Sequence, residues 1–190
     1  MSARPSPERA APAIRRATAD DAAAYSALAR QLAIDTFARD NDPSDFAIYL
    51  RDTYGVARQL AEIGDPDAVV LLAELEGAIA GYAYVRRGTA PACVTGEAAV
   101  EFARFYVDGR WHGRGVAQAL MRRAAEEARA LGARTIWLGV WERNPRARAF
   151  YAKCGYEDVG SHTFMLGTDA QTDRVMAAGV DALLATLPGR

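Results

Sequence analysis

The stretch 102–115, FARFYVDGRWHGRG, constrains the fold more than any other part of the chain. It begins with aromatic and β-branched residues that suit a strand, and Asp108-Gly109 then interrupts the pattern. After Gly115, apolar residues recur at helical spacing as far as position 131. A strand that passes through a glycine-containing loop into a helix presents free backbone N–H groups and the positive end of the helix dipole. The sequence therefore predicts an anion site in the loop 110–115.

The composition of this loop favours phosphate as the anion. Gly113 and Gly115 let the backbone approach a phosphate closely, and Arg110 and Arg114 add positive charge. A Walker loop is excluded because no Lys follows the second glycine, and the dinucleotide fingerprint is excluded because Gln118 stands where its third glycine would be. A glycine-rich turn without a ligand remains the alternative at this point.

Length, charge and cysteine content narrow the class of protein. The 190 residues suit one domain, and the net charge of −1 indicates no general affinity for nucleic acid. Cys93 and Cys154 have neither the spacing of a metal site nor that of a disulfide framework, which suggests a reduced, cytoplasmic protein without a metal. No apolar run approaches the ~20 residues of a membrane span, so we expect no membrane association.

The chain divides into a loose N-terminal tail at 1–12, a domain at 13–176 and a C-terminal extension at 177–190. Periodicity and turn residues predict strands at 13–17, 69–75, 78–85, 98–107, 135–141, 156–159 and 161–166. They predict helices at 18–37, 42–54, 57–63, 116–131 and 144–154, and a weakly helical segment at 171–187. This order predicts an α/β fold with a mixed sheet, in which a parallel crossover joins 98–107 to 135–141.

A second informative stretch is 137–156, WLGVWERNPRARAFYAKCGY. Asn144-Pro145 is a helix N-cap followed by a proline at the first helical position, and Gly155 ends that helix. The loop R-x-x-G-x-G and the later A-x-x-F-Y-x-K-x-G-Y together resemble the two halves of the signature of the GNAT superfamily of acetyl-CoA-dependent N-acetyltransferases. The later motif is carried by Ala147, Phe150, Tyr151, Lys153, Gly155 and Tyr156. The resemblance covers roughly residues 14–166.

The resemblance implies a single-domain GNAT fold, with a mostly antiparallel sheet of six to seven strands flanked by helices and a splayed parallel pair at its centre. It also implies which residues bind acetyl-CoA. The backbone of Phe105, Tyr106 and Val107 would hold the pantetheine arm and polarise the thioester carbonyl. The pyrophosphate loop would comprise Arg110, Trp111, His112, Gly113, Arg114, Gly115 and Val116. Asn144, Tyr151 and Lys153 would also contact the cofactor.

Acetyl transfer to an amine needs a neutral amine, a hydrogen-bond donor for the carbonyl oxygen and a proton for the departing thiolate. By resemblance, the general acid is the Tyr of the F-Y pair, Tyr151. Glu101 and Glu142 are the candidates for the general base, acting directly or through water. Alternatively, Glu101 and Glu142 are ordinary solvated carboxylates without a catalytic role.

The acceptor is indicated by a closing element, G-x-H-x-F-x-L-G-x-D-x-Q-T-D at 160–173, and by Asp35-Thr36-Phe37. Both resemble the bacterial spermidine/spermine acetyltransferase branch. The segment also contains an acidic cluster, Asp40, Asp42, Asp45 and Asp52. The cluster is compatible with a polycationic ligand. Alternatively, these aspartates cap helices or lie on solvated faces. We therefore expect direct attack of a polyamine on acetyl-CoA in a ternary complex. A protein N-terminal or lysine acetyltransferase and a catalytically silent acyl-CoA-binding module remain alternatives, and a homodimer remains open.

Overall fold

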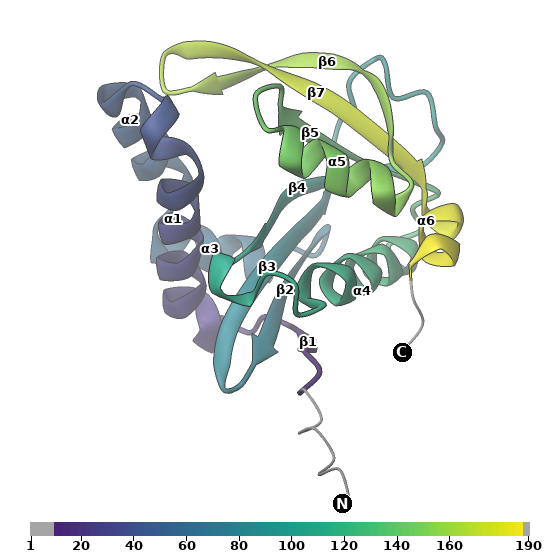
Figure 1. Cartoon of the computed structure of the whole chain (residues 1–190), viewed down its shortest axis with the longest axis horizontal. Coiled ribbons are helices and arrows are strands. Elements are labelled where there is room, and N and C mark those ends of the chain that lie inside the picture. Colours follow the sequence, from purple (N-terminus) through teal and green to yellow (C-terminus); the bar gives the residue numbers. More distant parts are fainter. Residues whose placement is uncertain (1–9, 188–190) are drawn as a thin grey trace, which may run out of the picture.

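The computed structural model describes residues 10–187, which form one seven-stranded mixed sheet with helices on both faces (Figure 1). The strand order is β1-β2-β3-β4-β5-β7-β6, and β4 and β5 are the parallel pair. The strands are β1 (Ala13–Arg16), β2 (Ala68–Leu75), β3 (Ala78–Arg87), β4 (Ala99–Val107), β5 (Thr135–Trp141), β6 (Glu157–Leu166) and β7 (Asp169–Gly179). The helices are α1 (Ala22–Phe37), α2 (Pro43–Thr53), α3 (Val56–Gly64), α4 (Val116–Ala130), α5 (Pro145–Cys154) and α6 (Val180–Thr186). The predicted α/β fold with a mixed sheet is confirmed.

Local sequence signals account for several of the helix starts. The Asp42 carboxylate accepts the backbone N–H of Ser44 at 2.8 Å, and Pro43 opens α2. The Asn144 side chain accepts the N–H of Ala147 at 3.1 Å, and α5 then begins at a proline. Both caps were predicted, because a short polar side chain followed by proline satisfies an N–H group and supplies the helical φ angle.

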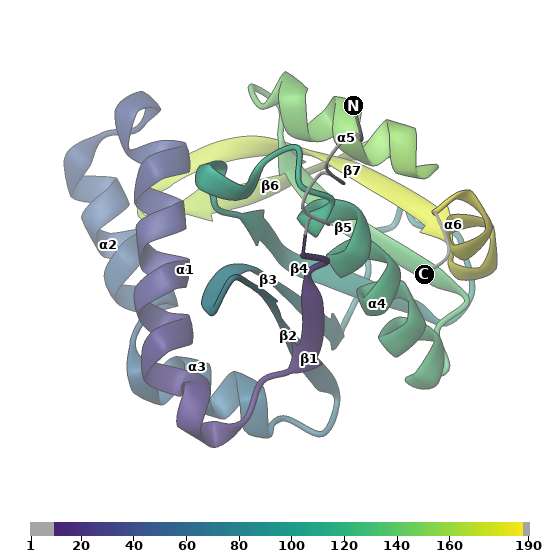
Figure 2. The same cartoon turned by 60° about the horizontal axis from the view of Figure 1, so that its bottom comes forward.

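The sheet separates two hydrophobic cores, one beneath each group of helices (Figure 2). On the α4 side, Leu120 and Met121 pack with Ile136 of β5. On the side of α1, α2 and α3, Tyr25 packs edge to face on Tyr82, with ring centroids 5.0 Å apart. Alternate residues of each central strand thus enter opposite cores.

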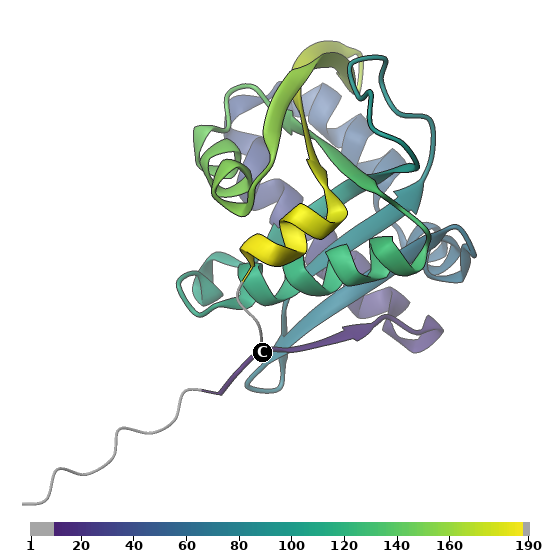
Figure 3. The same cartoon turned by 90° about the vertical axis from the view of Figure 1, so that its right-hand side faces the viewer.

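The C-terminal third differs from the prediction in two places. The expected strands 156–159 and 161–166 are one strand, β6, which contains a β-bulge between Asp158 and Gly160. The expected helix at 171–187 is wrong, because β7 occupies most of it and the short α6 follows (Figure 3). β7 pairs with β5 on one side and β6 on the other, and these long-range hydrogen bonds override the helical preference of its alanines.

The segment after β7 belongs to the same core as α4. Val180 and Leu183 of α6 are fully buried in it. Residues 1–9 of the expected N-terminal tail and 188–190 of the expected extension lie outside the described residues. Within residues 10–187, no helix combines the length and the apolar character that crossing a membrane requires.

Candidate active site

The site lies where the two parallel strands separate. β4 and β5 pair from Ala99 to Glu101 with Thr135 to Trp137, and the register gives no pairs beyond that point. The pairing of β4 with β3 shifts register at Ala103, which has no partner in β3. This β-bulge lies just where β4 and β5 diverge. A cavity of about 800 Å³ occupies the gap, with walls from α1, α2, β4, β5, α5, β6 and β7. The predicted splayed pair is therefore present.

One end of this cavity lies beside the loop that leads into α4. Gly113 and Gly115 have φ angles of 74° and 79°, and no atom lies within 4 Å of where their side chains would begin. The N–H group of Arg114 donates to the Trp111 carbonyl oxygen at 3.3 Å, but those of Gly113, Gly115, Val116 and Ala117 donate to no acceptor within the described part of the chain. These groups and the helix dipole suit an anion, and the open space around the glycines fits a phosphate.

The predicted loop side chains differ in what they contact. Arg110 lines the cavity and pairs with Asp108 at 2.6 Å. His112 also lines it, with Nε2 3.0 Å from the Val107 carbonyl oxygen. Arg114 instead turns back to Glu76 at 2.5 Å and packs over the Trp111 ring. Five of the predicted loop residues do not line the cavity, namely Trp111, Gly113, Arg114, Gly115 and Val116. Ala117 in the first turn of α4 does line it, so the open N–H groups adjoin the cavity.

Arg146 is a cation at this end of the cavity that sequence reasoning missed. It lines the wall from the first turn of α5, and its Nη2 lies 2.7 Å from His112 Nδ1. The one local signal for it was its position in the first turn of α5, two residues after the Asn144 cap. Lys153, which was expected to touch a cofactor, is exposed near the end of α5 and does not line the cavity.

The middle of the cavity is formed by β4 and α5. Phe105, Tyr106, Val107 and Asn144 all line it, as does Tyr151, which is 8% exposed. The Tyr151 hydroxyl makes no hydrogen bond to any described residue. Burial raises the pKa of Tyr151 above its ordinary value, so the phenol keeps its proton at neutral pH and can donate it.

The cavity wall carries four carboxylates, from Asp35, Asp40, Asp108 and Asp173, of which Asp108 pairs with Arg110. The acidic cluster expected from the sequence contributes only Asp40 to it. Asp42 caps α2, while Asp45 accepts a hydrogen bond from Thr168 Oγ1 at 2.7 Å. The charges that face the cavity therefore come mostly from other positions.

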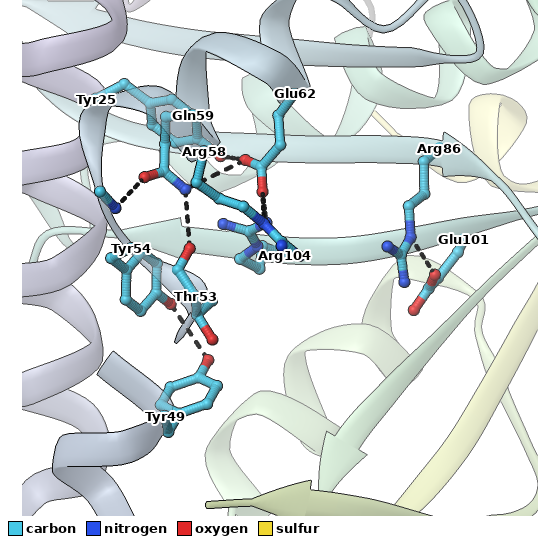
Figure 4. A network of polar contacts seen from close by, with 11 residues as sticks. Tyr25, Tyr49, Thr53, Tyr54, Arg58, Gln59, Glu62, Arg86, Glu101 and Arg104 are labelled. Atoms are coloured by element: carbon cyan, nitrogen blue, oxygen red, sulfur yellow. Dashed lines mark hydrogen bonds and ion pairs between the residues drawn. The ribbon is translucent and has the colours of Figure 1, made fainter. Parts of the chain in front are cut away.

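The two carboxylates expected as general bases both lie off the cavity wall. Glu101 accepts a hydrogen bond from Arg86 Nε at 2.6 Å, and this pair stands apart from the cavity residues in Figure 4. Glu142 is exposed after the end of β5. Asp173 does line the cavity, and burial raises its pKa to about 6. Sequence reasoning missed it, because its strand was predicted as a helix.

A buried ion pair supports the wall of the cavity beside α3 (Figure 4). Arg104 of β4 is bonded to Glu62 of α3, and both side chains are at least nine-tenths buried. The guanidinium lies 4.9 Å from the centre of the Tyr84 ring, and the Tyr25 hydroxyl donates to Glu62 at 3.1 Å. Arg104 is a lining residue, so this pair holds one side of the site in place.

Within residues 10–187, no group of three or more His, Cys, Asp or Glu side chains is arranged to hold a metal ion.

Among solved structures, the fold is similar to that of PaiA N-acetyltransferase from Thermoplasma acidophilum in complex with coenzyme A. The TM-score is 0.71 with 20% sequence identity, over 90% of this chain and 99% of that one. It is also similar to yncA from Salmonella typhimurium with its cofactor acetyl-CoA, with a TM-score of 0.69 and 21% identity over 90% and 95% of the two chains.

The sequence also matches known proteins directly. The model of the acetyltransferase (GNAT) family matches residues 30–156. An uncharacterized N-acetyltransferase from Lactobacillus delbrueckii subsp. lactis is 33% identical over 149 residues, 78% of this chain and 86% of that protein. An uncharacterized N-acetyltransferase from Mycobacterium bovis is 36% identical over 134 residues, 70% of this chain and 81% of that protein. The chain therefore belongs to the acetyltransferase (GNAT) family and is an N-acetyltransferase.

Proposed function

We propose that this protein transfers the acetyl group of acetyl-CoA to a primary amine, by direct attack within a ternary complex. The observation that carries the proposal is the arrangement of the cavity between β4 and β5. Open N–H groups at the start of α4 adjoin this cavity, and Tyr151 lines it together with the carboxylates of Asp35, Asp40 and Asp173. A thioester and an amine that enter from opposite ends would meet beside that tyrosine.

The phosphate end supports acetyl-CoA as the donor. The N–H groups of Gly113, Gly115 and Val116 would bind the pyrophosphate, and Arg110 and Arg146 would add positive charge from the cavity wall. The two similar structures, PaiA N-acetyltransferase and yncA, contain coenzyme A and acetyl-CoA respectively. When bound, acetyl-CoA supplies an activated acetyl group as a thioester.

The middle of the cavity supports transfer. The backbone of β4 from Phe105 to Val107 would hold the pantetheine arm, since β5 leaves this edge of β4 unpaired. Tyr151 would give its phenolic proton to the departing thiolate, and its burial keeps that proton in place until the C–S bond breaks.

The acceptor end favours a polyamine such as spermidine or spermine. Asp35, Asp40 and Asp173 place three carboxylates on the cavity wall, and spaced carboxylates can pair with the spaced ammonium groups of such a ligand. The resemblance of 160–173 to the spermidine/spermine branch agrees with this assignment, because the segment forms β6, the following turn and the start of β7 beside these carboxylates.

An amine panel tests the proposal. Purified protein, acetyl-CoA and either spermidine, spermine, a peptide with a free N-terminus or a lysine peptide are mixed, with free thiol followed by absorbance and product by mass spectrometry. We expect acetylated spermidine or spermine. Product from a peptide alone would replace the polyamine with a protein acceptor. Acetyl-CoA binding without thiol release for any amine would identify a silent binding module instead.

A further inference from the structure

We propose that Asp173 is the general base of the reaction: it accepts the proton of the acceptor ammonium group, and His162 tunes it from the neighbouring strand. The inference rests on the proposed function, because it assigns a role within the same cavity. It differs from the expectation from the sequence, which considered Glu101 and Glu142.

The position of Asp173 suits this role. It lies on β7 opposite Trp141 of β5 and lines the same cavity as Tyr151. Its side chain is 13% exposed, and its carboxylate accepts no hydrogen bond from any described residue. Such a carboxylate is mostly removed from water but can still be reached from the cavity. Because no hydrogen-bond donor occupies its oxygens, their lone pairs are free to accept a proton from an ammonium group.

His162 lies next to this carboxylate. It faces Asp173 across the β6–β7 pair, and its Nε2 is 4.0 Å from Asp173 Oδ2. That nitrogen is buried and has no hydrogen-bond partner within the described residues. The distance is too long for a hydrogen bond but short enough for a strong charge effect in a partly buried site.

A glycine in the adjacent strand leaves the space in which these two side chains approach each other. A Cβ atom at Gly139 of β5 would lie 2.6 Å from His162 Nε2 and 3.1 Å from Asp173 Oδ2. Glycine in the middle of a strand is less favourable than alanine, because it loses more conformational freedom on folding. Its presence here therefore has a local reason, which is room for His162 and Asp173.

Four titratable groups on the surrounding elements interact electrostatically with Asp173: His162 of β6, Glu142 after β5, Tyr49 of α2 and Tyr106 of β4. Burial raises the pKa of Asp173 to about 6; the charge of His162 opposes this rise and that of Glu142 adds to it. Burial raises the pKa of both tyrosines, and the nearby Asp173 charge adds to the rise. The tyrosines therefore stay neutral, and His162 and Glu142 are the two groups whose charges tune the base.

The proposed step balances as follows. An N–H bond of the substrate ammonium breaks and an O–H bond forms on Asp173, which leaves a lone pair on nitrogen. That lone pair forms a bond to the thioester carbonyl carbon, and the C–S bond breaks as the sulfur takes the Tyr151 proton. The nitrogen, which is positively charged once the new N–C bond has formed, loses its second proton to solvent, so that the product is a neutral amide. Asp173 then releases its proton through the cavity and Tyr151 regains one from solvent, which leaves a net release of one proton for each acetyl group transferred.

The test uses the amine that gives the most product with the wild-type protein, so that an inactive wild type would reject the proposed function and not this inference. Asp173→Asn should lower kcat/KM by roughly 10²-fold or more, the usual scale for general-base work. The carboxylate of Asp181 on α6, which is 90% exposed, supplies the matched control, Asp181→Asn. Circular dichroism and thermal melting check that Asp173→Asn is folded.

The pH profile separates a base from a structural carboxylate. In the wild type, kcat/KM should rise with pH through about 6, because the base must lose its proton first. His162→Gln removes the interaction that lowers the pKa of Asp173 and should move this rise to higher pH, whereas Glu142→Gln removes an interaction that raises that pKa and should move the rise to lower pH. The rise should be absent in Asp173→Asn. An unchanged profile in Asp173→Asn, or shifts of the two tuning variants in the same direction, would overturn the proposal.

Discussion

The ring of Tyr151 meets the ring of Phe105 edge to face, with centroids 6.2 Å apart and planes at 66°. Tyr151 belongs to α5, which follows β5, and Phe105 belongs to β4. The contact therefore bridges the gap that the two splayed strands leave open, and it fixes the tyrosine ring at the middle of the cavity.

Because this ring contact does not involve the hydroxyl, Tyr151→Phe should retain the packing and remove only the proton. We expect kcat to fall by roughly 10²–10⁴-fold and acetyl-CoA affinity to change little. Steady-state kinetics and calorimetric titration measure the two quantities. Since burial raises the pKa of Tyr151, wild-type activity should also show no loss from ionisation of this group up to the ordinary tyrosine value of about 10. A variant with near wild-type kcat would make Tyr151 a packing residue.

Gly115→Asp should abolish most acetyl-CoA binding, because it adds a side chain and a negative charge at the open N–H groups. The substitution also strains the backbone, since Gly115 has a φ angle of 79°. Gly132→Asp is the matched control, because Gly132 has a φ angle of 85° at the far end of α4. Calorimetry should show loss of affinity in the first variant alone, while thermal melting shows a similar loss of stability in both. Equal affinities would reject the loop assignment.

The polyamine assignment predicts a dependence on cavity carboxylates and on salt. Asp35→Asn with Asp40→Asn should raise the KM for spermidine several-fold and change kcat less, because pairs made away from the reacting atoms contribute to uniform binding. In the wild type, KM should increase with ionic strength, since these aspartates are exposed and salt screens their charge. Asp42→Asn with Asp52→Asn removes the same charge outside the cavity. If the control pair raised the KM for spermidine more than Asp35→Asn with Asp40→Asn does, the negative charge would attract spermidine to the protein surface in general and not bind it in the cavity.

The Arg104–Glu62 pair should matter for stability more than any exposed pair. Among the described residues, Arg104→Met leaves the buried Glu62 with only the longer ion pair to the exposed Arg58, at 3.8 Å. Loss of one member of a buried pair costs about 3–5 kcal/mol of unfolding free energy. The double change Arg104→Met with Glu62→Leu should cost much less than the sum of the single changes, because no buried charge remains. Urea unfolding of the four proteins measures the coupling. Additive losses would show that the pair does not act as a unit.

The sequence predicted the backbone of the loop before α4 and the start of α5, because the signals for both are local. Glycines with positive φ angles, the Asn144 cap and the proline that follows it each determine the backbone within a few residues. The parallel pair followed from the order of the elements, since a strand, a helix and a strand in sequence require a crossover.

The acceptor end could not be predicted in the same way. Asp173 is mostly removed from water only because β7 inserts between β5 and β6. The β5 residues that pair with β7 lie more than thirty residues earlier in the chain. Arg104 similarly depends on Glu62, which lies on a helix 42 residues before it. Neither contact leaves a periodic pattern in the sequence around it. Gly139, a glycine in the middle of an otherwise apolar strand, was the one local sign of crowding near Asp173.

The insertion of β7 has a consequence for synthesis on the ribosome. By the time α5 has emerged, the chain already contains the loop 110–115 and Tyr151. One edge of β5 nevertheless has no strand to pair with until the residues of β7 have been synthesised. Such an unpaired edge can recruit a foreign strand. A nascent chain stalled before residue 169 would therefore expose β5 to intermolecular pairing, and chaperone binding should be strongest during this interval.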